Sequence, residues 1–166
     1  MKFHRLILLL SHLWDYPRVE LLEEAKNVLE KIGLRPEDPS ILAQEYVRLF
    51  VNAPGGVPAP PYASYYLTGL LAQEPAKEAL YFYAREGLFP EGPEPADHLS
   101  YELAFVAHLL SQGRKDTLGE FMGQHFWRWF PRFKAALSAA KPHPFYLSLA
   151  EITEEVLRTL EEEDET

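Results

Sequence analysis

The sequence predicts an all-α, single-domain helical bundle of about eight or nine helices. Apolar residues recur at helical spacing along most of the chain, and no stretch alternates apolar and polar residues as a half-buried strand would. Proline and glycine residues punctuate the periodic segments. The length of 166 residues is that of one ordinary domain, whose core needs no disulfide or metal in order to fold.

The first half of the chain predicts three helices and a long loop. Residues 3–16 and 19–32 each form an apolar helix that ends at a following proline or glycine. After a turn at residues 36–40, a third helix begins. Its apolar positions are Ile41, Leu42, Tyr46, Leu49 and Phe50. A Pro/Gly loop at residues 51–61 follows, because those residues exclude a helix or an internal strand.

The second half of the chain predicts the remaining helices. We expect them at about residues 62–67, 74–86, 95–112, 117–130, 133–141 and 145–160. Pro131 is expected to interrupt an aromatic-rich helical segment, since proline removes a backbone donor. The acidic tail at residues 161–166 is expected to fray.

The composition excludes several classes of protein. The chain has no cysteine, which excludes a disulfide framework, a cysteine nucleophile and Cys-ligated metal sites, and fits a cytoplasmic location. A net charge of -9 argues against nucleic acid as a partner, because its phosphates would be repelled. The apolar start is too short for a signal peptide, and no run of about 18 apolar residues exists, so we expect no stable membrane insertion.

A polar stretch opens the central helix. Pro95 suits the first helical position, and Glu94 or Asp97 can cap the free N–H groups of the first turn. His98 and Glu102 are four residues apart and therefore neighbour each other at the edge of the apolar face. The opposite face carries Asp97, Tyr101 and His108. Polar groups thus crowd the start of a helix whose other side must be buried.

This cluster invites a metal or catalytic interpretation, which ligand counting weakens. One helix supplies at most two well-placed ligands, and the histidines elsewhere show no ligand spacing. No nucleophile or phosphate-binding motif is present. We therefore predict no catalytic residue, no metal and no cofactor. A helical metalloprotein or enzyme built on Asp97, His98 and Glu102 remains an alternative, as does a structural subunit that buries the region of Trp127 and Trp129 in a larger complex.

Aromatic residues beside the loop favour a binding role. Tyr62, Tyr65 and Tyr66 directly follow the Pro/Gly loop, and rigid aromatics next to a flexible loop make good peptide-docking surfaces. Trp127 and Trp129 stand two residues apart, so they point to different sides of their helix. We expect only one of the two to be fully buried.

The central stretch resembles the signature of the TorD/DmsD/NarJ family of redox-enzyme maturation chaperones. That signature is a Glu-x-Pro-Asp-His element that runs into an apolar Glu-Leu-x-Phe helix, and here it reads Glu94-Pro95-Ala96-Asp97-His98 followed by Glu102-Leu103-Ala104-Phe105. The proline stands one place further from the aspartate than in the commonest form. Further blocks that resemble the family, in its order, are residues 10–17, 46–50, 61–67, 125–133 and 145–150.

The resemblance implies a function and a site. It implies a cytoplasmic chaperone, not an enzyme, that binds the twin-arginine signal or N-terminal segment of the catalytic subunit of a molybdopterin-dependent reductase. Such a chaperone assists cofactor insertion before export or assembly, and its relatives are monomers or homodimers. The peptide-binding residues that we predict are Phe50, Tyr62, Ser64, Tyr66, Glu94, Pro95, Asp97, His98 and Glu102. The acidic surface would attract the basic part of the peptide and aromatic side chains would bury its apolar part.

Overall fold

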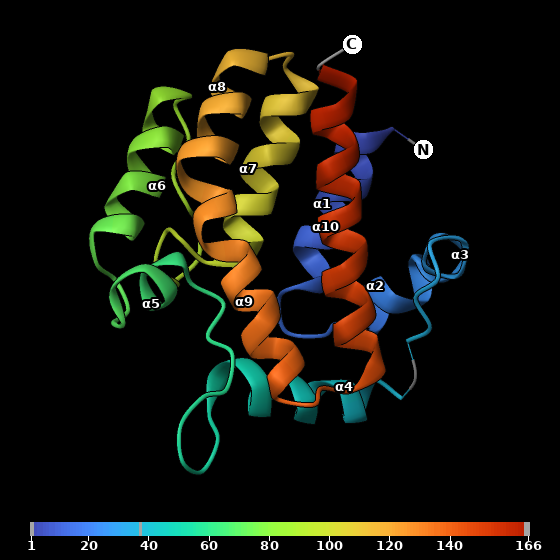
Figure 1. Ribbon diagram of the computed structural model, residues 1–166. Helices are drawn as coiled ribbons and strands as arrows, with labels where there is room; N and C mark the ends of the chain where they lie inside the picture. The colour runs from blue at the N-terminus through green and yellow to red at the C-terminus, as the bar shows by residue number, and fades with distance from the viewer. Residues whose placement is uncertain (1, 37, 165–166) are drawn as a thin grey trace. The chain divides into compact units, whose positions relative to one another are not determined.

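The computed structural model describes residues 2–36 and 38–164, and this part of the chain is all-α (Figure 1). These residues contain no strand, and the extended pairing recorded in them is one isolated antiparallel bridge between Tyr62 and His98. The prediction of an all-α fold is confirmed. Over the same residues, no helix combines the length and the apolar character that crossing a bilayer requires.

Two long connections, residues 52–62 and 86–98, separate helices that otherwise follow one another closely. The helices are α1 (Phe3–Leu13), α2 (Val19–Glu24), α3 (Lys26–Lys31), α4 (Pro39–Tyr46), the π-helical segment η1 (Val47–Val51), α5 (Ala63–Thr68), α6 (Glu74–Arg85), α7 (Leu99–Ser111), α8 (Lys115–Phe121), the π-helical segment η2 (Met122–Phe126), α9 (Trp127–Ala139) and α10 (Pro144–Asp164). Several of these segments continue one another without a break, which agrees with about eight or nine helices in the sequence pattern.

Two compact units can be distinguished by their internal contacts. One unit combines Met1–Trp14 with Pro60–Ala135, and the other combines Asp15–Ala59 with Ala136–Thr166. The first unit holds the polar stretch at the start of α7, so it contains most of the predicted site.

The first unit is built around α7 and a set of buried aromatic rings. α1 packs along α7, while α6, α7 and the continuous segment α8–η2 run side by side (Figure 1). Trp129, Phe130 and Phe133 are fully buried, and the Trp14 ring contacts the Phe133 ring edge-on at 5.4 Å between centroids. Trp127 is half-buried, so the expectation that only one of the two tryptophans is fully buried is confirmed.

The predicted interruption at Pro131 is wrong, because Pro131 lies inside α9. Its missing N–H costs one helical hydrogen bond, and a proline inside a helix costs about 3 kcal/mol. The rings of Trp129, Phe130 and Phe133 are all buried on either side of it, and each buried apolar side chain contributes about 1.5–3 kcal/mol. The packing of these rings outweighs the lost bond and keeps the helix continuous.

The second unit contains α2, α3, α4, η1 and α10. The Asp38 carboxylate caps α4 by accepting the Ser40 N–H at 2.9 Å. Phe50 is 5% exposed and packs between Tyr46 and Tyr146, with ring centroids 5.1 and 5.4 Å away. The acidic tail is expected to fray from residue 161, but α10 continues to Asp164. Residues 165–166 lie outside the described part of the chain.

Candidate functional site: the loop–helix junction at Asp97 and His98

A short antiparallel contact ties the residues before α5 to the residues before α7. The Leu99 N–H donates to the Pro61 carbonyl at 2.9 Å, and the Ala63 N–H donates to the Asp97 carbonyl at 3.4 Å. Tyr62 and His98 face each other between these two bonds. Two segments far apart in sequence are therefore held together at one junction, which consists of residues 61–64 and 94–99.

His98 caps α7. Its Nδ1 accepts the Ser100 N–H at 3.1 Å, and His98 is only 3% exposed. The predictions that Pro95 is the first helical residue and that Glu94 or Asp97 caps this helix are wrong, since α7 begins at Leu99. A turn closed by the His98 N–H and the Pro95 carbonyl, 3.1 Å apart, precedes the helix instead. An imidazole nitrogen can replace the carboxylate because an N-cap needs only a hydrogen-bond acceptor.

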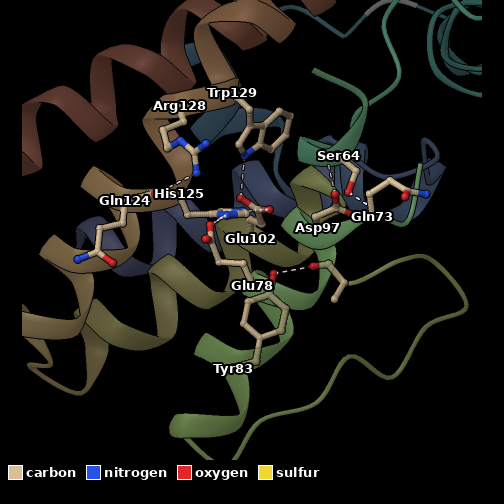
Figure 2. Close-up of polar contacts among 11 residues, drawn as sticks. Ser64, Gln73, Glu78, Tyr83, Asp97, Glu102, Gln124, His125, Arg128 and Trp129 are labelled. Atoms are coloured by element: carbon tan, nitrogen blue, oxygen red, sulfur yellow. Dashed lines mark hydrogen bonds and ion pairs between the residues drawn. The ribbon is translucent and has the colours of Figure 1, made fainter. Parts of the chain in front are cut away.

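Asp97 caps a different helix, α5. Its Oδ2 accepts the N–H of Ser64, the second residue of α5, at 2.7 Å (Figure 2). The Ser64 hydroxyl in turn accepts the Gln73 N–H at 3.1 Å. Asp97 is fully buried, and its Oδ1 has no hydrogen-bond partner among the described residues. Its carboxylate is therefore satisfied on one side only.

An exposed layer of side chains covers the junction. The Tyr62 hydroxyl donates to Oε2 of Glu94, and the Glu94 N–H donates to the Tyr101 hydroxyl at 3.3 Å. The rings of Tyr62 and Tyr101 lie 5.1 and 5.8 Å from the His98 ring. Glu94 is exposed, whereas Tyr62 and Pro95 are half-buried. A ligand can reach these three residues without disturbing the buried ones.

Glu102 belongs to a buried network that the sequence did not reveal. Its Oε1 accepts the Trp129 Nε1–H at 3.0 Å, and its Oε2 lies 2.7 Å from His125 Nε2. His125 Nδ1 lies 2.6 Å from Glu78 Oε1 (Figure 2). We call Glu78, Glu102, His125 and Trp129 the ion core. The interpretation of Glu102 as the partner of His98 is replaced by these contacts, which join residues too far apart in sequence for helical spacing to predict.

Burial and charge together set the pKa values in the ion core. Burial raises the pKa of Glu102 to about 6, although the bonds from His125 and Trp129 oppose that rise. Burial by itself would lower the pKa of His125, but Glu102 and Glu78 outweigh it and raise the value to about 9. The opposing charges outweigh burial at His125, which has two carboxylate partners. Burial prevails at Glu102, which has one cationic partner.

The ion core does not support the metal alternative. Both carboxylate oxygens of Glu102 are already paired, and both ring nitrogens of His125 face carboxylates. In the part of the chain that the structure describes, no group of three or more His, Asp or Glu residues could hold a metal ion.

The structure assembles most of the predicted peptide-binding residues in the first unit. Ser64, Asp97 and His98 form the buried part of the junction, and Glu102 lies beyond them in the ion core. The Tyr66 ring stacks on Trp129 at 6.1 Å between centroids, and the buried Tyr66 hydroxyl has no hydrogen-bond partner within the described residues. Phe50 belongs to the second unit. The role of each of these residues in peptide binding stays a prediction.

Comparisons with known proteins find similar sequences. The sequence model described as nitrate reductase delta subunit matches residues 15–135. The chain is 33% identical to the chaperone protein TorD of Shewanella piezotolerans over 68% of its length, and 31% identical to that of Shewanella loihica over 83%. The aligned segments span 57% and 67% of those relatives' own lengths.

A solved structure shares the fold. It is the crystal structure of an Archaeoglobus fulgidus protein assigned to redox enzyme maturation, with a TM-score of 0.75, 26% sequence identity and 95% of each chain covered. The family match covers more than half of the chain, and it includes the junction and the start of α7. The chain therefore belongs to the TorD/NarJ family of redox-enzyme maturation proteins, which the nitrate reductase delta subunit model describes.

Proposed function

We propose that this protein is a cytoplasmic maturation chaperone, and not an enzyme, for a molybdopterin-dependent oxidoreductase. It binds the twin-arginine signal, or the equivalent N-terminal segment, of the catalytic subunit. It assists insertion of the molybdopterin cofactor before that subunit is exported or assembled, and it works as a monomer or a homodimer. Family membership and the names of the chaperone relatives support this proposal.

The construction of the junction is the observation that carries the proposal. Buried Asp97 and His98 fix the backbone of two segments, and the same junction presents the Glu94 carboxylate beside the Tyr62 ring at the surface. An arginine guanidinium pairs with a carboxylate through two parallel hydrogen bonds and stacks on aromatic rings. The net charge of -9 would also speed the encounter with a basic segment.

In this proposal the accessible residues of the predicted site contact the peptide, and the buried residues support them. Glu94, Tyr62 and Pro95 are accessible and contact the peptide. Ser64, Asp97, His98 and Glu102 are buried and act as supports that hold the contact surface in place. A rigid support lowers the ordering cost of binding, because fewer side chains lose freedom when the peptide arrives.

Titration calorimetry with synthetic peptides tests the binding step. The probes are the N-terminal segments of the molybdopterin-dependent catalytic subunits encoded in the same genome, and we expect at least one to bind with a Kd on the order of micromolar. Glu94→Lys should weaken that binding about tenfold or more, because it places a like charge against the arginine pair.

Glu20→Lys is the matched control, since it changes the net charge equally at an exposed residue of α2 in the second unit. A loss of affinity that is equal for the two variants would show that only overall charge matters and would remove the junction from the site. Failure of the unaltered protein to bind any of the segments would contradict the proposed function itself.

Deletion of the gene tests the maturation step. Without the protein, the client subunit should accumulate with less molybdenum per polypeptide, and expression of the unaltered chain should restore the metal content. A client that contains its full cofactor in the deletion strain would contradict a maturation role. Permanent co-purification of this chain with the mature enzyme in fixed ratio would instead favour a structural subunit.

A further inference from the structure

A second feature of the first unit lies next to the junction, and the sequence motifs did not identify it. A cavity of about 390 Å³ opens between α7 and the loop that follows α6. Its lining includes Tyr83, Phe89, Tyr101, Ala104, Phe105 and His108. The volume falls within the range of about 300–1,000 Å³ that is usual for ligand pockets.

One face of α7 forms the floor of this cavity. Tyr101, Ala104, Phe105 and His108 recur at the spacing of three and four residues that places side chains on the same side of a helix. The Phe105 ring packs edge-on against Tyr83 at 4.8 Å between centroids, and both side chains are 3% exposed. Ala104 lies in the middle of this face, and its small side chain leaves space at the floor of the cavity.

The loop that covers the cavity is pinned in place by two tyrosines. The Tyr101 hydroxyl accepts the Glu94 N–H at 3.3 Å, and the Tyr83 hydroxyl donates to the Ala96 carbonyl at 2.7 Å. Gly92 permits the close approach of Tyr101, because a Cβ atom at that position would collide with the Tyr101 hydroxyl. Both tyrosines also line the cavity, so the cavity and the junction share a wall.

The rim of the cavity combines an apolar ring with negative charge. Phe89 is 69% exposed, an unusual exposure for so large an apolar side chain. Glu91 lines the cavity, Glu94 follows on the same loop, and both are exposed. None of the described lining residues is Lys or Arg. The chemistry that complements this surface is an apolar side chain within a segment that also carries positive charge.

We propose that this cavity receives the apolar side chains of the client's N-terminal segment, while Glu91 faces the basic residues of the same segment. The inference rests on the proposed function and adds to it the contact surface that the buried Asp97 and His98 cannot provide. The junction fixes the loop, the loop and α7 form the cavity, and Phe89 closes over the bound side chain.

The test is fluorescence anisotropy with two labelled synthetic peptides. One carries a pair of arginines followed by a run of leucine and alanine, and the other has the same arginines followed by serine and glycine. We expect the unaltered protein to bind the first peptide at least about tenfold more tightly than the second, because only the first can fill the cavity.

Two variants address the cavity in opposite ways. Ala104→Leu fills it, and leucine is as compatible with a helix as alanine to within a few tenths of a kcal/mol, so the fold is retained. Phe89→Ser removes the exposed rim ring without touching the core. Each should weaken binding of the leucine–alanine peptide about tenfold and leave binding of the serine–glycine peptide unchanged. Tyr81→Ser is the matched control, because Tyr81 is 67% exposed and lies outside this cavity.

The possible failures are distinguishable. If the unaltered protein binds the leucine–alanine peptide and both cavity variants bind it equally well, the cavity is not the site, although the proposed function stands. If Tyr81→Ser weakens binding as much as Phe89→Ser does, the cavity assignment is also overturned. If Ala104→Leu changes the mass of the protein in solution and not its peptide affinity, a second copy occupies the cavity. If the unaltered protein binds neither peptide nor any client segment, the proposed function fails and the inference fails with it.

Discussion

Two carboxylates lie fully buried near the start of α7, and their surroundings differ. Glu102 has both oxygens paired, one with Trp129 Nε1 at 3.0 Å and the other with His125 Nε2 at 2.7 Å. Asp97 has one oxygen paired with the Ser64 N–H at 2.7 Å, and its other oxygen has no partner among the described residues. The first carboxylate is part of the ion core and the second is part of the junction.

The difference separates the structural role of Glu102 from the supporting role that we propose for Asp97 in peptide recognition. When one member of a buried ion pair is removed, the charge of the other member stays buried without its partner. Substitutions in the ion core are therefore expected to destabilise the protein strongly. Asp97 caps a six-residue helix through one backbone N–H, so less structure depends on it. The ion core joins side chains of α6, α7, η2 and α9, whereas the junction positions a loop beside a cavity.

The largest expected effect comes from Glu102→Leu. This change removes the buried one of the two carboxylate partners of His125 and leaves Trp129 with an unpaired N–H, and breaking a buried pair costs about 3–5 kcal/mol. Urea denaturation at pH 7 should therefore show a midpoint far below that of the unaltered protein. Glu102→Gln, which keeps an acceptor for Trp129, should cost less. A loss under about 1 kcal/mol for Glu102→Leu would show that the ion core is not structural.

The pH dependence of stability tests the same network. His125 has a pKa of about 9 in the folded protein and 6.5 as its ordinary value, so its contribution is complete below pH 6.5 and is lost as the pH rises through 9. The pKa of Glu102 is also raised, which lowers stability as the pH rises toward 6. We expect the free energy of unfolding to fall by on the order of 2–3 kcal/mol between pH 6.5 and 9. In His125→Gln the curve should be flat over this window, and a slope equal to that of the unaltered protein would refute the assignment.

The features that the sequence predicted are those set by neighbouring residues. The helical periodicity placed most helices, and Gly33, Gly87 and Gly113 stand after helices with positive φ values of 85°, 72° and 67°, as expected of helix stops. The α4 cap at Asp38 is equally local, since its acceptor and donor are two residues apart. Local steric and hydrogen-bond preferences decide such features, so one sequence suffices to predict them.

The features that were missed depend on residues distant in sequence. The partner of Glu102 is His125, 23 residues away on another helix, and the partner of Asp97 is Ser64, 33 residues away. A helical wheel compares only residues within one helix, so it paired Glu102 with His98 instead. The cavity was missed for a similar reason. The wheel placed Tyr101 and His108 on one face, but the loop residue that completes the rim, Phe89, could be placed only by the fold.

Asp97→Ala should cost clearly less than Glu102→Leu. The substitution leaves the Ser64 N–H without its acceptor, a loss of about 1–2 kcal/mol, part of which is regained because a half-satisfied buried carboxylate is removed. Asp97→Asn retains an oxygen for Ser64 and should stay within about 0.5 kcal/mol of the unaltered protein. Urea denaturation of both variants gives the comparison. If Asp97→Ala destabilised the protein as much as Glu102→Leu, the distinction between junction and ion core would disappear.

The smallest expected effect is that of Tyr62→Phe, which acts on the exposed layer of the junction. The substitution removes the hydroxyl that donates to the exposed Glu94 carboxylate but keeps the ring, whose centroid lies 5.1 Å from that of His98. Water can replace the lost partner at an exposed carboxylate, so the free energy of unfolding should change by less than about 0.5 kcal/mol. Thermal unfolding of Tyr62→Phe and Tyr62→Ala side by side separates the hydroxyl from the ring, because only the second variant also loses the ring contact. A loss above about 1 kcal/mol for Tyr62→Phe would move Tyr62 from the contact surface into the structural part of the junction, and Glu94 and Pro95 would then be the predicted junction residues left to contact the peptide.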